Sequence, residues 1–239
     1  MTSISMGKNY EERMFGTVGG RYVSSIEIRV IFEYLEPRKD DNVLDVGTGT
    51  GRIARPLAGY VKELIGVDQD RTVLRAALIK AKLEGITNYS AVIGSSEYLP
   101  FREECFDKLV CVRSLKYFKD HMKSLMEMSF SLKNGGTLIL EVSNILSWAV
   151  IVRLPKIFLT GSLGHPKLFT LRDITNKLWN NGFVIVDRYA LHKVEPMLFN
   201  KINNRSVTRM LIILDSTLHK LTPFELFSRG AVLRCLKLS

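Results

Sequence analysis

Cysteine and histidine are both scarce in this chain. Its 239 residues include four scattered histidines and three cysteines (Cys105, Cys111 and Cys235), without a CxxC pair or a histidine near a cysteine. An odd, widely spaced set of cysteines argues against a disulfide framework and against a metal site. We therefore expect reduced cysteines and no metal. The histidines show no Ser-His-Asp spacing, so no catalytic base is assigned.

Long apolar runs are also missing. A membrane-spanning helix needs about 18 consecutive apolar residues, and the nearest candidate, Ile145 to Leu154, is interrupted by Arg153. The sequence starts with MTSISMGKNYEERMF, which has no apolar run behind a cationic start, so we expect no signal peptide. Together these absences predict a cytoplasmic protein.

Basic residues are concentrated in the last hundred positions. The formal net charge is +10, and from Leu140 onward 14 Lys and Arg accompany only 6 Asp and Glu. Such an excess can attract nucleic acid, anionic lipid or an acidic substrate. It can equally serve solubility alone, and the sequence leaves these alternatives open.

Strand and helix periods alternate along the chain, which is typical of a parallel sheet flanked by helices. The predicted strands are Asn42–Val46, Leu64–Val67, Tyr89–Ile93, Phe106–Val112, Gly136–Glu141, Phe183–Leu191 and Ala231–Lys237. The predicted helices are Arg52–Ala58, Arg71–Glu84 with a stop at Gly85, Met122–Leu132 before an Asn134-Gly135-Gly136 turn, Thr170 to about Asn181, and Ser206–Lys220.

One domain with inserts fits this pattern best. We expect an amino-terminal helical lid at 1–41, a cofactor-binding core at 42–141, and completion of the sheet at 142–239 with inserts at about 145–168 and 191–230. The amino-terminal segment could close over a site or merely cover the sheet. The apolar insert Ile145–Leu159 carries Arg153 and Lys156. It is either core or a surface for a membrane or a long-chain substrate.

A glycine-rich loop follows the first predicted strand. It reads Asp45-Val-Gly47-Thr-Gly49-Thr-Gly51-Arg, and glycines there let the backbone approach a nucleotide closely. The glycines occupy positions 1, 3 and 5 of the motif, whereas the dinucleotide fingerprint requires 1, 3 and 6. The Gly-Lys-Ser/Thr of a Walker loop is absent.

A carboxylate ends the second predicted strand. Asp68 lies 17 residues beyond Gly51, close to the spacing of about 20 residues at which an acidic side chain meets a ribose. Two hydroxyl groups donating to one carboxylate make charge-assisted hydrogen bonds. This position therefore favours a ribose over a phosphate.

Four segments in order resemble the motifs of the class I S-adenosylmethionine-dependent methyltransferases. They are VLDVGTGTGRIARPLA, IGVDQD, GSSEYLPFREECFDKLVCVRSLKYF and LKNGGTLIL, and they are most similar to the small-molecule branch that includes the ubiquinone/menaquinone-biosynthesis methyltransferases. The resemblance spans about a hundred residues. It implies an α/β, Rossmann-like, seven-stranded and mostly parallel sheet, with helices on both faces and an antiparallel last strand. It also implies S-adenosyl-L-methionine as the cofactor.

The resemblance further implies roles for individual residues. Asp68 takes the ribose hydroxyls, Gln69 lies beside the adenine, and the methionine portion is held by Asp45, Gly47, Thr48, Gly49 and Gly51. Ser95 and Ser96 stand where the family usually has Asp-Ala near the adenine amino group, and Arg113 follows the fourth strand at the methionine end. Lys116 and Tyr117 replace the histidines of many relatives, so the usual catalytic role is not transferred.

The expected reaction is in-line displacement of an activated methyl group, which depends mainly on orientation and on exclusion of water. The acceptor is predicted to be a small or lipid-like molecule, with possible contact to a membrane surface. An RNA acceptor using the basic carboxy-terminal part is the second hypothesis, although no Asn/Asp-Pro-Pro-Tyr motif or appended RNA-binding module is present. The third is a binding protein that has lost catalysis. The oligomeric state is not predicted.

Overall fold

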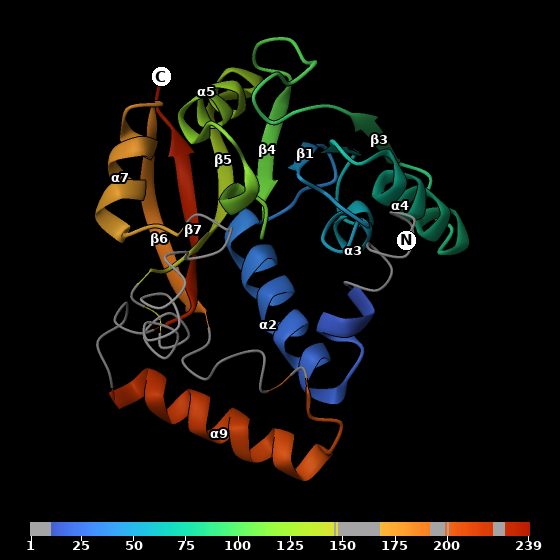
Figure 1. Cartoon of the computed structure of the whole chain (residues 1–239). Coiled ribbons are helices and arrows are strands. Elements are labelled where there is room, and N and C mark those ends of the chain that lie inside the picture. Colours follow the sequence, from blue (N-terminus) through green and yellow to red (C-terminus); the bar gives the residue numbers. More distant parts are fainter. Residues whose placement is uncertain (1–10, 146, 148–167, 192–198, 200, 222–227) are drawn as a thin grey trace.

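Seven strands form one sheet in the order β3-β2-β1-β4-β5-β7-β6 (Figure 1). The structure is a computed structural model that describes residues 11–145, 147, 168–191, 199, 201–221 and 228–239. Its elements in chain order are α2 (Val18–Leu35), β1 (Asn42–Val46), α3 (Ala54–Ala58), β2 (Glu63–Asp68), α4 (Arg71–Leu83), β3 (Tyr89–Ile93), β4 (Phe106–Cys111), the 3-10 turn η1 (Leu115–Tyr117), α5 (His121–Ser131), β5 (Leu132–Ser143), α7 (Leu171–Trp179), β6 (Phe183–Leu191), α9 (Arg205–Leu221) and β7 (Gly230–Lys237).

The sheet is parallel from β3 to β5 and antiparallel around β7. β1 pairs in parallel with both β2 and β4, while β7 runs antiparallel to β5 and β6. The carboxyl ends of β1, β2 and β4 therefore meet at one edge of the sheet, which is where ligands bind in open α/β folds. The predicted seven-stranded, mostly parallel sheet with an antiparallel last strand is confirmed.

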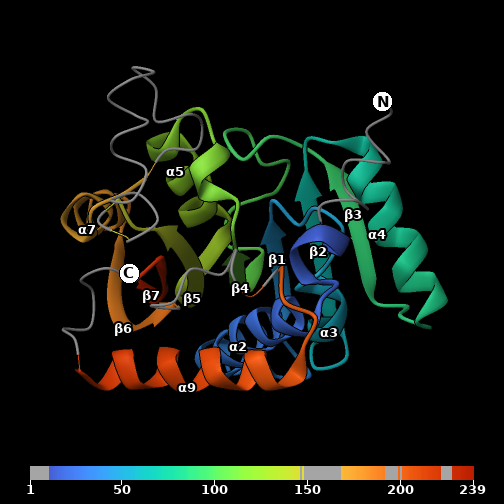
Figure 2. The same ribbon diagram turned by 60° about the horizontal axis from the view of Figure 1, so that its bottom comes forward.

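Apolar side chains cover both faces of the sheet. Along β1, Val43 belongs to the core beneath α2, α3 and α4, whereas Leu44 points to the opposite core beneath α5 and α7. The same alternation in β5 divides Leu138 from Ile139. Helices therefore lie on both faces, as predicted and as Figures 1 and 2 show, because every second side chain of a buried strand needs its own apolar layer.

Local capping explains where several helices begin and end. The Asp70 side chain accepts the N–H of Thr72 at 2.7 Å at the start of α4, and Thr170 accepts the N–H of Asp173 at 3.1 Å at the start of α7. These side chains satisfy backbone donors that the first helical turn leaves open. After α4, Gly85 adopts φ +72, the left-handed conformation that commonly follows a helix.

The start of β5 differs from the prediction. The sequence pattern placed Leu132 in the preceding helix and began the strand at Gly136, but β5 begins at Leu132. Phe106 pairs with Leu132 and Lys108 pairs with Thr137, so residues 133–136 oppose a single residue of β4. The glycines thus accommodate a bulge inside the strand and not a turn before it.

Two further observations concern the inserts. None of the helices in the described ranges combines the length and hydropathy that a bilayer crossing requires. The apolar segment Ile145–Leu159 lies outside the described residues apart from positions 145 and 147, as do the first ten residues of the predicted lid. The helix predicted at Ser206–Lys220 is confirmed as α9, which lies beside α2 at the lower edge of both ribbon views.

Candidate active site

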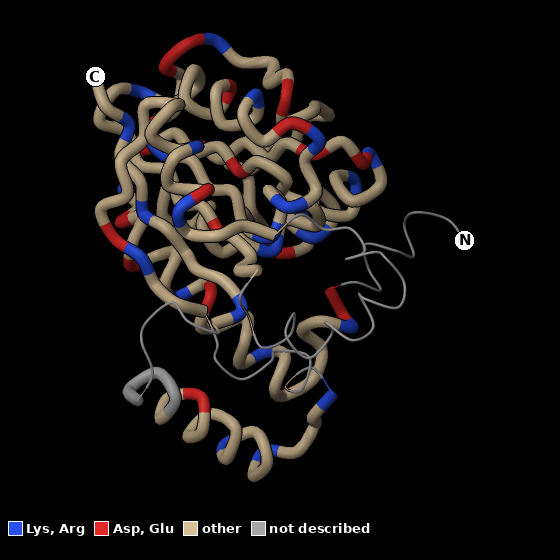
Figure 3. Tube along the Cα trace, turned by 60° about the vertical axis from the view of Figure 1, so that its left-hand side comes forward, with Lys and Arg blue, Asp and Glu red and all other residues tan. Residues whose placement is uncertain are grey.

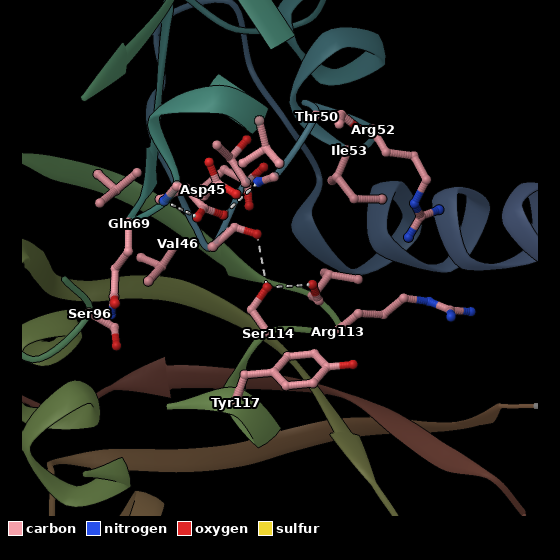
Figure 4. Close-up of a pocket in the computed structure, with 18 of the residues that line it drawn as sticks. Asp45, Val46, Thr50, Arg52, Ile53, Gln69, Ser96, Arg113, Ser114 and Tyr117 are labelled. Carbon is pink, nitrogen blue, oxygen red and sulfur yellow. Dashed lines mark hydrogen bonds between the residues drawn. The ribbon is translucent and has the colours of Figure 1, made fainter. Parts of the chain in front are cut away.

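A cavity of about 750 Å³ opens at the carboxyl ends of β1, β2 and β4 (Figure 4). The amino-terminal segment before α2, the loops after β1, β2, β3 and β4, and the first turn of α4 build it. Its walls are formed by Glu11, Arg13, Phe15, residues 45–50, Arg52, Ile53, residues 67–70, Val73, Gly94, Ser96, residues 112–114, Tyr117 and Phe118. The cavity therefore combines backbone-rich, acidic and apolar surfaces.

The glycine loop owes its path to two close approaches. Gly47 has φ +76, and a Cβ at this position would lie 2.4 Å from the side chain of Ser114. The N–H groups of Gly47 and Thr48 both donate to the carbonyl of Val67, at 2.8 and 3.0 Å. A Cβ at Gly49 would meet no atom within 4 Å. Gly47 is thus needed for packing, whereas Gly49 presents open backbone to the cavity.

Asp68 is held rigidly at the end of β2. One carboxylate oxygen accepts the N–H of Gly49 at 3.0 Å, and the other accepts the N–H of Asp70 at 3.0 Å. Each carboxylate oxygen can accept two hydrogen bonds, so both retain capacity for a ligand. The two backbone bonds fix the direction in which that capacity points.

The adjacent Gln69 and Ser95 interact with each other. Gln69 Nε2 donates to Ser95 Oγ at 3.3 Å, and Ser95 Oγ also donates to Glu97. Gln69 and Ser96 line the cavity, but Ser95 does not. Ser95 thus contacts Gln69, which lines the cavity.

Asp45 is buried at the base of the glycine loop. Burial raises the pKa of its carboxyl group to about 7, and a hydrogen bond from Thr48 opposes that rise only partly. In the unfolded chain the pKa of this carboxyl group has its ordinary value of 3.8. Asp45 therefore stays protonated to a higher pH in the folded protein than in the unfolded chain.

This difference makes stability depend on pH with a defined sign. Between the two pKa values the folded state binds more protons than the unfolded state does. We therefore expect the unfolding free energy to decrease as the pH rises, by roughly 1 kcal/mol per pH unit between about pH 5 and pH 7. Denaturant unfolding of the wild type and of Asp45→Asn across this range tests it. The variant should lack this component of the slope, and parallel curves would refute the assignment.

The loop after β4 contacts the glycine loop directly. Arg113 adopts φ +59, a left-handed conformation that is uncommon for a non-glycine residue. Ser114 Oγ follows it and lies within hydrogen-bonding distance of the carbonyls of Gly47, at 2.9 Å, and Val112, at 3.0 Å (Figure 4). The turn thus aims the Arg113 side chain toward α2 while its neighbour holds the loop after β1.

A buried carboxylate joins two cavity arginines, and the sequence reading missed it. Glu27 of α2 is 1% exposed; it accepts hydrogen bonds from Arg113 Nε at 3.0 and 3.1 Å and from Arg52 at 2.8 Å. The ring of Phe15 lies 4.5 Å from the Arg52 guanidinium and 5.0 Å from that of Arg113. The sequence did contain a signal that Glu27 is buried, because Glu27 lies one helical turn after apolar Val23 and so on the same face of the helix.

The amino-terminal segment is attached to the glycine loop by Glu11. Its carboxylate accepts a hydrogen bond from Thr50 Oγ1 at 2.6 Å and forms ion pairs with Lys80 and Arg55. Burial raises the pKa of Glu11, but the hydrogen bonds from Lys80 and Thr50 and both cations outweigh it, so the pKa is lowered overall. Residues 11–15 thus cover part of the cavity, within the segment where a lid is predicted.

Most of the predicted binding residues converge on this cavity. Eight of them line it, namely Asp45, Gly47, Thr48, Gly49, Asp68, Gln69, Ser96 and Arg113. Gly51 and Ser95 are outside the lining. Gly51 has φ +74, and a Cβ there would approach Ala77 to 3.3 Å, so it seats the loop against α4. Lys116 is buried and also outside the lining, whereas Tyr117 lines it and is exposed.

The amino-acid sequence matches a family model described as a methyltransferase domain over residues 37–159. An uncharacterized methyltransferase of Bacillus subtilis, YcgJ, is 32% identical over 114 residues, which are 48% of this chain and 45% of that protein. A ubiquinone/menaquinone biosynthesis C-methyltransferase of Wigglesworthia glossinidia brevipalpis is 32% identical over 109 residues, 44% of each chain. The chain thus spans about half the length of these curated relatives.

Solved structures share the fold over a longer stretch. A SAM-dependent methyltransferase of Thermotoga maritima superimposes with a TM-score of 0.68 at 20% sequence identity, covering 99% of this chain and 100% of that one. At this identity the likeness concerns the fold.

Proposed function

The chain belongs to the methyltransferase-domain family of class I S-adenosylmethionine-dependent methyltransferases, and on that premise we propose that it transfers a methyl group to a small or lipid-like acceptor. The observation that carries the proposal is the convergence, on one cavity, of open backbone at Gly49 and a rigidly held carboxylate at Asp68. Both lie at the ends of neighbouring parallel strands.

The residues present fit the cofactor that the family uses. The remaining acceptor capacity of Asp68 suits two ribose hydroxyls, and apolar Val67 and Val73 line the same part of the cavity. The loop around Gly47 and Gly49 would hold the methionine portion. Gln69 would lie beside the adenine, with Ser95 as its hydrogen-bond partner.

S-adenosylmethionine supplies a methyl group that is already activated on a sulfonium. The tasks left to this chain are to orient an acceptor and to exclude water. Phe15 and Phe118 supply apolar wall, and Tyr117 and Arg113 supply polar groups at the same cavity. No general base is assigned, because one is needed only if the acceptor must lose a proton.

The acceptor class rests on two supports. Apolar side chains make up much of the cavity wall around Ile53 and Val112, which suits an apolar small molecule. One curated relative is described as a ubiquinone/menaquinone biosynthesis C-methyltransferase. A quinol with a short prenyl tail is therefore the first acceptor to try.

The test has two steps. Calorimetry measures binding of S-adenosylmethionine, and formation of S-adenosylhomocysteine is then followed with prenylated quinols, other small phenols and bulk RNA. Turnover with a quinol or phenol supports the proposal. Turnover with RNA alone would replace the acceptor class, tight binding without turnover on any acceptor would point to a binding protein, and absence of binding would refute the assignment altogether.

A further inference from the structure

Helix α9 stands apart from the sheet (Figure 1), and among the described residues it packs by one side against the amino-terminal part of the chain. The Asn204 side chain caps it by accepting the N–H groups of Ser206 at 2.9 Å and Val207 at 3.1 Å. Its inner side includes Leu211 and Ile212, which pack against a small apolar cluster of Phe15, Val23 and Phe199. The helix is therefore fixed to the amino-terminal part of the chain.

The outer side of α9 is apolar as well. Val207, Met210 and Leu214 follow the i, i+3, i+7 spacing of one helical face, and Ile213 lies beside them. Their exposed fractions are 41%, 70%, 48% and 64%, in the order Val207, Met210, Leu214, Ile213. Single exposed apolar residues need no explanation, but a continuous stripe along a helix marks an interaction surface.

The exposed charges that the structure describes in α9 and in the turn before it are of one sign. Lys201, Arg205 and Arg209 are exposed, whereas Asp215, the acid in the described part of the helix, is 4% exposed and turned inward. Figure 3 shows α9 at the periphery of the molecule, beyond α2. The surface offered by its described side chains is thus an apolar stripe bordered by cations.

We propose that α9 docks on an anionic lipid membrane, lying in the plane of the interface with Met210, Ile213 and Leu214 inserted. A helix with an apolar face and flanking arginines has the composition of interfacial helices. Basic residues near such a surface are attracted by anionic headgroups. At 17 residues, α9 is about 25 Å long, which suits a helix that lies flat.

Other occupants fit the surface less well. A contact between two copies of α9 would bring together two surfaces of the same charge, with no exposed carboxylate in the described helix to balance Arg205 and Arg209. A nucleic acid would match the cations but would leave the apolar stripe in water. An anionic membrane satisfies both features at once.

The docking also has a consequence for the cavity. Leu211 and Ile212 on the inner side of α9 contact the cluster that contains Phe15, and Phe15 lines the cavity. A docked α9 would therefore hold one wall of the cavity close to the lipid. The docking itself does not depend on methyl transfer, so it can be tested whether or not the proposed activity is correct.

Vesicle co-sedimentation tests the proposal with the whole chain. The wild type should bind vesicles of phosphatidylcholine containing about one third phosphatidylserine, and bind pure phosphatidylcholine much more weakly. The triple variant Met210→Ser, Ile213→Ser, Leu214→Ser should partition about 100-fold less. The variant Arg205→Gln, Arg209→Gln should lose roughly fivefold per arginine on anionic vesicles.

A matched control comes from α4, where Ile79 and Leu83 are 52% and 82% exposed. The variant Ile79→Ser, Leu83→Ser should bind vesicles like the wild type. Thermal melts should show a cooperative transition in every variant, because the substituted side chains are exposed or half-exposed. Absence of wild-type binding, equal binding by the triple variant, a dimer that this variant converts to monomer, or RNA that displaces the vesicles would each overturn the proposal.

Discussion

Replacement of Asp68 by alanine is expected to weaken binding of S-adenosylmethionine at least about 100-fold, because two hydrogen bonds to a charged group contribute about 1.5–3 kcal/mol each. The carboxylate already accepts hydrogen bonds from the N–H groups of Gly49 and Asp70. It is therefore oriented before the ligand binds, and binding does not have to order it. Titration calorimetry with the cofactor measures the effect.

The control for this variant lies on the same strand. Glu63 begins β2 at the opposite end and is exposed, so Glu63→Gln removes a carboxylate from the strand without touching the cavity. Its affinity should equal that of the wild type. If Asp68→Ala stays folded and binds as tightly as Glu63→Gln does, the ribose does not lie where we place it.

The second large effect concerns Glu27. We expect Glu27→Gln to lower the unfolding free energy by about 3 kcal/mol or more, because removing one partner of a buried ion pair leaves the other charge uncompensated. Here two guanidinium groups, those of Arg52 and Arg113, lose the same counter-charge. Denaturant unfolding at neutral pH measures the loss.

Helix α2 also provides the comparison. Glu33 is exposed and lies 4.0 Å from Arg29 one turn away, and such surface pairs contribute less than about 0.5 kcal/mol. Glu33→Gln should therefore leave stability nearly unchanged. Equal losses in the two variants would mean that helix propensity, and not the buried triad, determines the effect.

The parts of the fold that could be predicted from the sequence are those determined by neighbouring residues along the chain. The two edge strands, Tyr89–Ile93 and Phe183–Leu191, have the predicted bounds, because short β-branched runs between turn residues are distinctive. The start of β5 was wrong, because a bulge opposite Asp107 depends on pairing with another strand. Sequence periodicity carries no information on such pairing.

The same division holds in the candidate site. The glycine loop and Asp68 were found from their own neighbours in sequence, since a backbone turn and a strand end are local features. Glu27, Arg52 and Phe15 were missed, because their association arises only when α2 packs across the sheet. Ser95, which its motif position predicts to lie near the adenine amino group, accepts a hydrogen bond from Gln69, and Gln69 lines the cavity.

The place of β7 in the sheet has a consequence for synthesis. β7 lies between β5 and β6 although it follows both in the chain, so neither strand has its full set of partners until Gly230–Lys237 has left the ribosome. At a synthesis rate of about 5–20 residues per second, the time between the synthesis of β6 and that of β7 is several seconds. Unpaired strand edges favour aggregation. The nascent chain is therefore most prone to aggregate just before β7 completes the sheet.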